Sequence, residues 1–225
     1  MTVGVIIQAR MGSTRLPGKV LKPIGGKTLL DHVLGRLATL DFPVVTMVAT
    51  SELEQDDAIE AHCASRGVAV FRGSESDVLD RYYRCAAHYR FAHVVRLTAD
   101  NPFTDIDELR LLIDLHLAED NDYTHSFGVL PLGVGAEIFS FEALARSAEQ
   151  GQADNHREHV NEYIQENLEL FKIGSLEVVP AKRHHELRLT VDTQDDYARA
   201  CQIAGHAPGR WITTEEAIEL CSRFA

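Results

Sequence analysis

Residues 8–19, "QARMGSTRLPGK", place two arginines, one lysine and two glycines directly after the short apolar run "VGVII". An arginine such as Arg15 can pair with two phosphate oxygens at once through its planar guanidinium, whereas Lys19 supplies a compact point charge. Glycines such as Gly12 and Gly18 allow the backbone to bend or to approach a ligand closely. This segment, the opening loop, therefore predicts a site that binds phosphate mainly through side-chain charge.

The opening loop is not one of the common phosphate-binding motifs. A P-loop requires G-x-x-x-x-G-K-[ST], but Gly12 and Gly18 are one residue too far apart, and Val20 replaces the hydroxyl residue. The string "GGKT" at 25–28 also fails, because Leu21 stands where the first glycine belongs. No GxGxxG follows the first predicted strand, so a dinucleotide-binding fold is not favoured.

The opening loop lies in a basic island within an acidic chain. The 225 residues carry a formal net charge of −12, yet residues 1–30 contain five lysines and arginines and no acidic residue. A chain this acidic is a poor general binder of nucleic acid. The local positive charge favours a small polyanion such as a nucleotide, and the alternative is a basic loop that is merely solvated.

Two aspartates offer the complementary chemistry. Asp100 ends the string "RLTAD" and Asp192 ends "RLTVD", each after an apolar segment that reads as a strand. Mg²⁺ in proteins takes one or two carboxylates and completes its shell with phosphate oxygens and water. Asp100 and Asp192 are therefore predicted to bind Mg²⁺, although an aspartate in the position of Asp192 could instead cap the following helix.

The elements that must position these residues alternate between strands and helices. Such alternation predicts an α/β fold with a doubly wound, mainly parallel sheet, whose ligands bind at the carboxyl ends of the strands. The predicted strands are 3–9, 44–50, 68–71, 93–98, 123–127, 136–139, 171–179 and 187–191, and the predicted helices are 30–40, 55–66, 77–90, 105–119, 140–149, 158–167, 194–203 and 215–223.

Length and composition favour one globular domain in a reducing compartment. A chain of 225 residues that is 45% hydrophobic can bury roughly 70% of its unfolded surface, so it needs no disulfides. The four cysteines form no CxxC pair and are predicted to be free thiols. Neither a leader nor an apolar run near 18 residues is found, so we expect a cytoplasmic protein without a membrane partner.

The string "QARMGSTRLPGKVLKPIGGKTLL" resembles the opening signature of the cytidylyltransferases that make CMP-activated sugar acids. This family includes the acylneuraminate and Kdo enzymes, and the likeness is greatest to its spore-coat polysaccharide biosynthesis (SpsF) branch. Five further strings follow in the family's order: "VATS" at 48–51, "VFRGSESDVLDRYY" at 70–83, "RLTADNP" at 96–102, "REHV" at 157–160 and "RLTVDT" at 188–193.

The resemblance implies the fold of nucleotide-diphospho-sugar transferases in a single domain, residues 1–225. An excursion at about 121–180 would form the acceptor pocket and the interface of a homodimer. CTP would be the co-substrate and Mg²⁺ the cofactor. An oxygen of a small acidic sugar would attack the α-phosphate of CTP and release pyrophosphate, in the biosynthesis of a surface polysaccharide or glycan.

The resemblance also implies roles for single residues. Asp100 would act in catalysis with the cations of the opening loop, while Asp77 is more simply a helix cap than a contact to the base. The family pattern places an acidic residue where "GVGAE" has Gly135, which leaves the acceptor open. The implied catalytic and nucleotide-binding residues are Gln8, Ala9, Arg10, Gly12, Arg15, Lys19 and Arg72, and the implied acceptor-binding residues are Glu137, Arg157, Glu158 and His159.

Two other functions compete with this interpretation. A metal-dependent glycosyltransferase would use a DxD string such as Asp105-Ile-Asp107, but its place at the start of a predicted helix is explained better by capping. A non-catalytic nucleotide-binding module would keep the fold without the chemistry. The presence of Asp100 and Asp192 together with the basic opening loop favours the transferase.

Overall fold

The computed structural model describes residues 2–224. Within them, seven strands form one sheet in the order β5-β4-β1-β6-β8-β7-β9, and β2 and β3 form a separate antiparallel hairpin. Only β8 runs against its neighbours in the sheet, so the predicted mainly parallel, doubly wound α/β fold is confirmed. The strands are β1 Val3–Gln8, β2 Pro23–Ile24, β3 Lys27–Thr28, β4 Val44–Ser51, β5 Ala69–Gly73, β6 His93–Thr98, β7 Tyr123–His125, β8 Glu137–Ser140 and β9 Ile173–Ser175.

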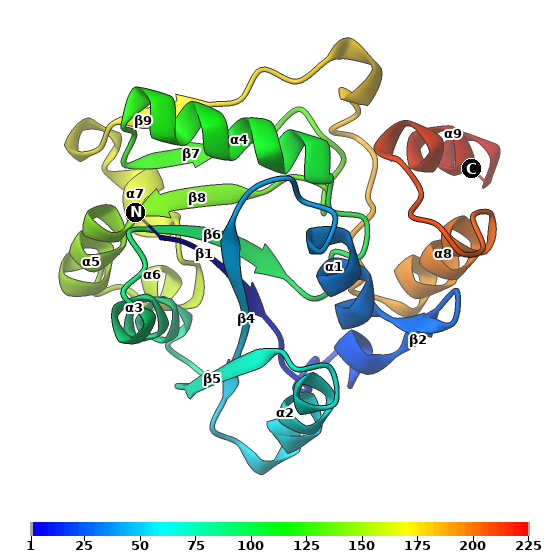
Figure 1. The fold of residues 1–225 in the computed structure, drawn as a ribbon, viewed down its shortest axis with the longest axis horizontal. Coiled ribbons are helices and arrows are strands. Elements are labelled where there is room, and N and C mark those ends of the chain that lie inside the picture. The colour runs from blue at the N-terminus through cyan, green and yellow to red at the C-terminus, as the bar shows by residue number, and fades with distance from the viewer. Residues whose placement is uncertain (1, 225) are drawn as a thin grey trace.

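Helices cover both faces of the sheet (Figure 1). One apolar cluster joins the sheet to α1, α2 and α4, a second joins it to α3, α5 and α7, and a third is centred on α8 and α9. No helix of residues 2–224 is long and apolar enough to cross a membrane. The α-helices are α1 Leu29–Leu37, α2 Asp57–Ala64, α3 Val78–Tyr89, α4 Ile106–Glu119, α5 Phe141–Gln150, α6 Asp154–Glu158, α7 Glu162–Glu166, α8 Gln194–Gly205 and α9 Thr214–Phe224, and the 3₁₀ turns are η1 Lys19–Leu21, η2 Glu54–Asp56, η3 Leu168–Leu170 and η4 Pro180–Lys182.

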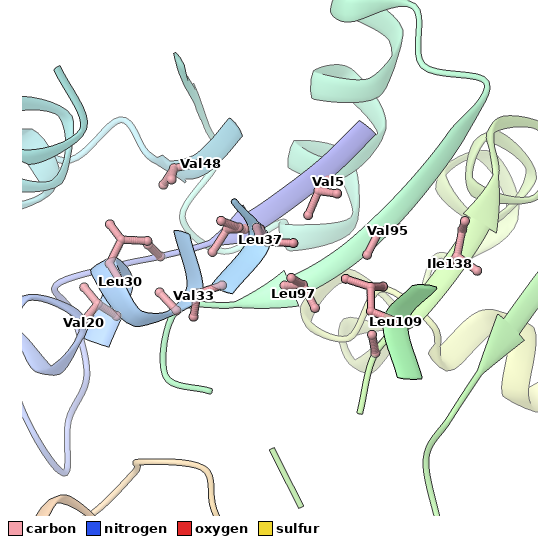
Figure 2. Close-up of a cluster of buried hydrophobic side chains, with 14 of the residues drawn as sticks. Val5, Val20, Leu30, Val33, Leu37, Val48, Val95, Leu97, Leu109 and Ile138 are labelled. Carbon is pink, nitrogen blue, oxygen red and sulfur yellow. The ribbon is translucent and has the colours of Figure 1, made fainter. Parts of the chain in front are cut away.

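Alternation along the central strands decides which side chains reach each face. Val5 in β1 and Val95 in β6 point to the layer of α1 and α4 and belong to the same buried cluster as Leu30 and Leu109 (Figure 2). Ile6, one residue on from Val5, belongs instead to the cluster that contains α3. The same period of two places the last polar residues of β1 and β6 on the α3 side of the sheet, at its carboxyl edge.

Capping residues fix where the helices begin. Thr28 and Asp31 form the predicted capping box of α1, in which each side chain accepts a hydrogen bond from the other residue's backbone N–H. Asp77 accepts from the backbone of Asp80 at the start of α3. Asp105 does the same for α4. The interpretation of Asp77 and Asp105 as helix caps is therefore confirmed.

The predicted strand at 187–191 is wrong. This segment forms only an isolated bridge between Arg188 and Leu132, because its backbone groups bond to loop carbonyls rather than to a neighbouring strand. The predicted helix at 158–167 is also wrong in extent, because α6 ends at Glu158 and α7 begins only at Glu162. The predicted strand at 171–179 is shortened to β9.

Candidate active site

A cavity of about 820 Å³ opens at the carboxyl edge of the sheet, over the ends of β1 and β6. This volume is typical of sites for small ligands. The opening loop forms one wall, and the loop after β7 forms another. Among the residues predicted from the sequence, the cavity brings together Gln8, Arg10, Gly12, Arg15, Lys19, Asp100, Glu158, His159 and Asp192.

Lys19 joins the two predicted metal ligands. Its Nζ lies 2.6 Å from Asp100 Oδ2 and 2.7 Å from Asp192 Oδ1, and the residue is only 8% exposed. Gly18 directs Lys19 into this position, because it turns the chain with a φ of 67°, a conformation that favours glycine. The backbone N–H of Val191 donates to the carbonyl of Asp100, which holds the two aspartates side by side although Asp192 does not end a strand.

The chemistry of this pair fits Mg²⁺. Both carboxylates converge on a single cationic centre, and their second oxygens are fixed by hydrogen bonds from Thr98 Oγ1 and from the guanidinium of Arg188. The described residues contain no group of three or more acidic, histidine or cysteine side chains that could hold a metal alone. Two carboxylates with room for phosphate oxygens are the set that Mg²⁺ commonly takes.

Asp192 is held in its ionised form. Burial alone would raise its pKa, but the hydrogen bond and charge of Lys19 and the charges of Arg188 and Arg15 bring the pKa below its ordinary value. Asp192 is therefore a carboxylate, as a metal ligand must be, well below neutral pH.

The two arginines of the opening loop are available to a ligand. The side chain of Arg15 is 63% exposed and its Nη2 lies 3.4 Å from Asp192 Oδ1. Arg10 is also substantially exposed, and its Nη1 lies 3.7 Å from Glu75 Oε1. Pairs this long and this exposed contribute little to stability, so both guanidinium groups can turn toward phosphate at small cost.

The predicted acceptor residues divide into two groups. Glu158 and His159 line the cavity. Glu137 is fully buried, where it binds Arg96 at 2.6 Å and accepts a hydrogen bond of 2.5 Å from the Tyr123 hydroxyl. Burial and the charge of Glu137 raise the pKa of Tyr123, which therefore stays protonated as the donor. Glu137 thus acts on the cavity only through Arg96, which lines it.

Arg157 and Gly135 shape the same region. Arg157 Nη1 lies 3.5 Å from Asp77 Oδ2 and ties α6 to the start of α3, outside the cavity lining. Gly135 lines the cavity, and a Cβ at this position would lie 2.9 Å from Ser126 Oγ and 3.3 Å from Phe127 Cδ1. An acidic side chain at residue 135 would therefore require Ser126 and Phe127 to move.

Sequence reasoning missed two residues that organise the site. Arg96 is visible in the sequence as a charge inside an apolar strand, and this signal could have identified it. Asp56 gave no such signal. It is fully buried and accepts hydrogen bonds from Met11 N at 2.7 Å and from the hydroxyls of Thr50 and Ser51. Asp56 therefore anchors the opening loop to the end of β4.

Neither Arg72 nor Ala9, whose backbone the resemblance implied as a contact to the base, belongs to the cavity lining. Arg72 donates to the carbonyls of Ser51 and Leu53, both at 2.9 Å, and pairs with two carboxylates of α2.

We expect Arg72→Ala to lower the free energy of unfolding by about 1–2 kcal/mol, because these contacts are lost, and to leave the KM for CTP unchanged. Thermal unfolding and steady-state kinetics check this, and a tenfold higher KM at unchanged stability would instead support a contact to the nucleotide.

Comparison with known proteins agrees with the geometry. A model of the family described as Cytidylyltransferase matches residues 4–220. The chain is 40% identical to spore coat polysaccharide biosynthesis protein SpsF of Bacillus subtilis, over 97% of this chain and 93% of that protein. It is 32% identical to the 8-amino-3,8-dideoxy-manno-octulosonate cytidylyltransferase of Shewanella loihica, over 59% of this chain and 53% of that protein.

A solved structure shows the same likeness over the whole chain. The structure of a cytidylyltransferase from Leptospira borgpetersenii superposes with a TM-score of 0.93 at 34% identity, covering 100% of this chain and 95% of that one. The match of the family model over nearly all residues and the cavity with its cations and aspartates point to one identity. The chain belongs to the cytidylyltransferase family and is a CTP-dependent nucleotidyltransferase.

Proposed function

We propose that the protein transfers CMP from CTP to a small acidic sugar or a related acceptor, with Mg²⁺ as cofactor and release of pyrophosphate. The observation that carries this proposal is the convergence of Asp100 and Asp192 on Lys19, in a cavity that Arg10 and Arg15 also line. The names of its relatives, a spore coat polysaccharide protein and an octulosonate cytidylyltransferase, support a role in surface polysaccharide or glycan biosynthesis.

The reaction asks the protein for positioning and for charge stabilisation. An oxygen of the acceptor forms a bond to the α-phosphorus while the bond to the bridging oxygen breaks, and pyrophosphate departs with that electron pair. Arg10, Arg15 and Lys19 bind the triphosphate and stabilise the charge that develops on the departing group. Bound Mg²⁺ would neutralise charge on the reacting phosphate, and Asp100 and Asp192 would hold it.

The cavity also suits an acidic sugar. Arg96 lines it with a buried Nε that has no hydrogen-bond partner among the described residues, so it can donate to an acceptor carboxylate. Phe127 is 39% exposed and offers an apolar surface to a sugar ring. Glu158 and His159 also line the cavity, and either side chain would serve as the base that takes the proton of the attacking hydroxyl.

The glycosyltransferase alternative finds no support at its DxD string. Asp105 is buried, where it pairs with Lys182 at 2.8 Å and accepts a hydrogen bond of 2.5 Å from Thr214 Oγ1, and it does not line the cavity.

The homodimer stays a prediction of the resemblance. Exposed Leu168, Leu170 and Val179 give the excursion an apolar surface that such an interface could cover.

A screen of nucleotides against acceptors tests the proposal. The protein is incubated with Mg²⁺, each of the four nucleoside triphosphates and a panel of acidic sugars, and pyrophosphate release is measured. We expect release only with CTP and an acidic sugar, together with a CMP-sugar that mass spectrometry detects. Consumption of a preformed nucleotide sugar would support the glycosyltransferase, whereas CTP binding without turnover on any acceptor would support a binding module.

A further inference from the structure

Several buried polar atoms without hydrogen-bond partners gather where β5 leads into α3. Arg81 is fully buried, and its guanidinium donates through Nη1 to the carbonyl of Ser74, while Nε and Nη2 have no partner among the described residues. In the part of the chain that the structure describes, Glu75 Oε2 is also buried without a partner, as is Gln8 Oε1 at the end of β1. Because buried polar groups are nearly always paired, a cluster of unpaired ones requires an explanation.

Packing alone does not explain Arg81. Within residues 2–224 it forms no ion pair within 4 Å, and burial holds its pKa below the ordinary range against the opposing charge of Glu75. Arg36, which is also deeply buried and has no ion pair among the described residues, donates to the carbonyls of Pro102 and Ile212, both at 2.8 Å. A buried guanidinium with two unpaired nitrogens lowers the stability of the fold. This cost is explained if Arg81 donates hydrogen bonds to a bound ligand.

Glu75 and Arg81 do not themselves line the cavity, but residues next to both of them do. Val78 lines the cavity, and Arg81 follows it by three residues on α3, a spacing that puts both on one side of the helix. Gly12 also lines the cavity, and a Cβ there would lie 3.3 Å from Glu75 Oε1. The carboxylate of Glu75 therefore lies against the opening loop, where its only ion pair is the long contact of 3.7 Å from Oε1 to Arg10 Nη1 among the described residues, and Oε2 stays available to a nucleotide bound along that loop.

We propose that Glu75 and Arg81 recognise the cytosine ring of CTP. The proposal rests on the function proposed above and assigns the base specificity of the same site. Cytosine presents an exocyclic amino group that donates and a ring carbonyl, O2, that accepts. Glu75 accepts from the amino group, and Arg81 donates to O2. Uracil presents a carbonyl oxygen in place of the amino group, and the Glu75 carboxylate repels it.

The Glu75→Gln variant tests this assignment by nucleotide binding without an acceptor. Calorimetry measures the affinities of wild type and variant for CTP and UTP with Mg²⁺. We expect wild type to prefer CTP, and Glu75→Gln to lower that preference about 10- to 100-fold, because an amide can also donate to uracil. Glu52→Gln is the matched control, since Glu52 is exposed in the neighbouring loop and should keep the wild-type preference.

The outcomes separate this inference from the proposed function. An unchanged ratio of CTP to UTP affinity in Glu75→Gln would overturn the role of Glu75 while CTP remains the substrate. Wild-type protein that binds no CTP at all would overturn both.

The Arg81→Met variant tests the second contact. Methionine fills similar space without a charge, so we expect the melting temperature of the ligand-free variant to be equal to or higher than that of wild type. Affinity for CTP and UTP should fall together, about tenfold or more, because both bases present O2. A lower melting temperature with unchanged CTP affinity would show that Arg81 serves the fold instead.

Discussion

Replacing Asp100 with asparagine is expected to lower kcat roughly 1,000-fold while the protein stays folded. The asparagine keeps the size of the side chain and the contact to Thr98, but it removes one of the two negative charges that would hold Mg²⁺. Stability should be retained because Lys19 still pairs with Asp192 at 2.7 Å, and two carboxylates then no longer share one ammonium. Pyrophosphate release measures the rate, and thermal unfolding checks the fold.

Asp107→Asn is the matched control for this variant. Asp107 is exposed near the start of α4, outside the cavity lining, and belongs to the string that a glycosyltransferase would use. We expect its rate to equal that of wild type. A near-normal rate in Asp100→Asn would remove Asp100 from the mechanism, and a large loss in Asp107→Asn would return the glycosyltransferase to consideration.

Local signals in the sequence were sufficient for much of the fold. Apolar periodicity predicted β6 with its observed bounds and placed β1 and β4 to within a residue at their ends. Thr28 and Asp31 predicted the start of α1, because a capping box depends on residues only three apart in the sequence. The opening loop was found in the same way, since its cations and glycines lie close together in residues 8–19 and directly follow an apolar strand.

Non-local contacts decided what the sequence could not show. Asp192 was predicted from a strand that does not form, and it reaches the site because the backbone of Val191 bonds to Asp100, 91 positions earlier in the chain. Asp56 read as an ordinary helix residue, yet its partner Met11 lies 45 residues away. Arg72 is the reverse case, because the family resemblance implied a contact to the nucleotide while its hydrogen bonds and ion pairs join β4 and α2.

The contrast between local signals and non-local contacts also explains why Lys19 has two roles. In the opening loop it is one of three cations suited to phosphate, and periodicity gives no reason to treat it apart. The fold buries it between Asp100 and Asp192, the two carboxylates that would hold the metal ion. Binding of the metal and of the triphosphate should therefore be coupled, because a metal ion would compete with Lys19 for the two carboxylates, and phosphate would give Lys19 a new partner.

Lys19→Met is accordingly expected to abolish turnover and to lower the free energy of unfolding by about 1–3 kcal/mol in metal-free buffer. The loss arises because Asp100 and Asp192 then face each other without the ammonium between them, while the remaining pairs of Asp192 with Arg188 and Arg15 and the partial exposure of both carboxylates limit the effect. Mg²⁺ alone should raise the melting temperature of the variant more than that of wild type, since no ammonium competes for the two carboxylates. Thermal unfolding with and without Mg²⁺ measures both effects.

The pH dependence of this variant follows from the lowered pKa of Asp192, to which Lys19 contributes. A lowered pKa in the folded state stabilises the protein above the unfolded value of about 3.9, and that contribution is lost as the pH falls through the folded value. The difference in unfolding free energy between wild type and Lys19→Met should therefore have its full size near neutral pH and shrink below about pH 4.

Lys22→Met, which changes a neighbouring lysine outside the cavity lining, should show neither the Mg²⁺ effect nor the pH effect. If Mg²⁺ alone stabilises wild type as strongly as Lys19→Met, Lys19 does not compete with the metal, and the two ligands bind independently.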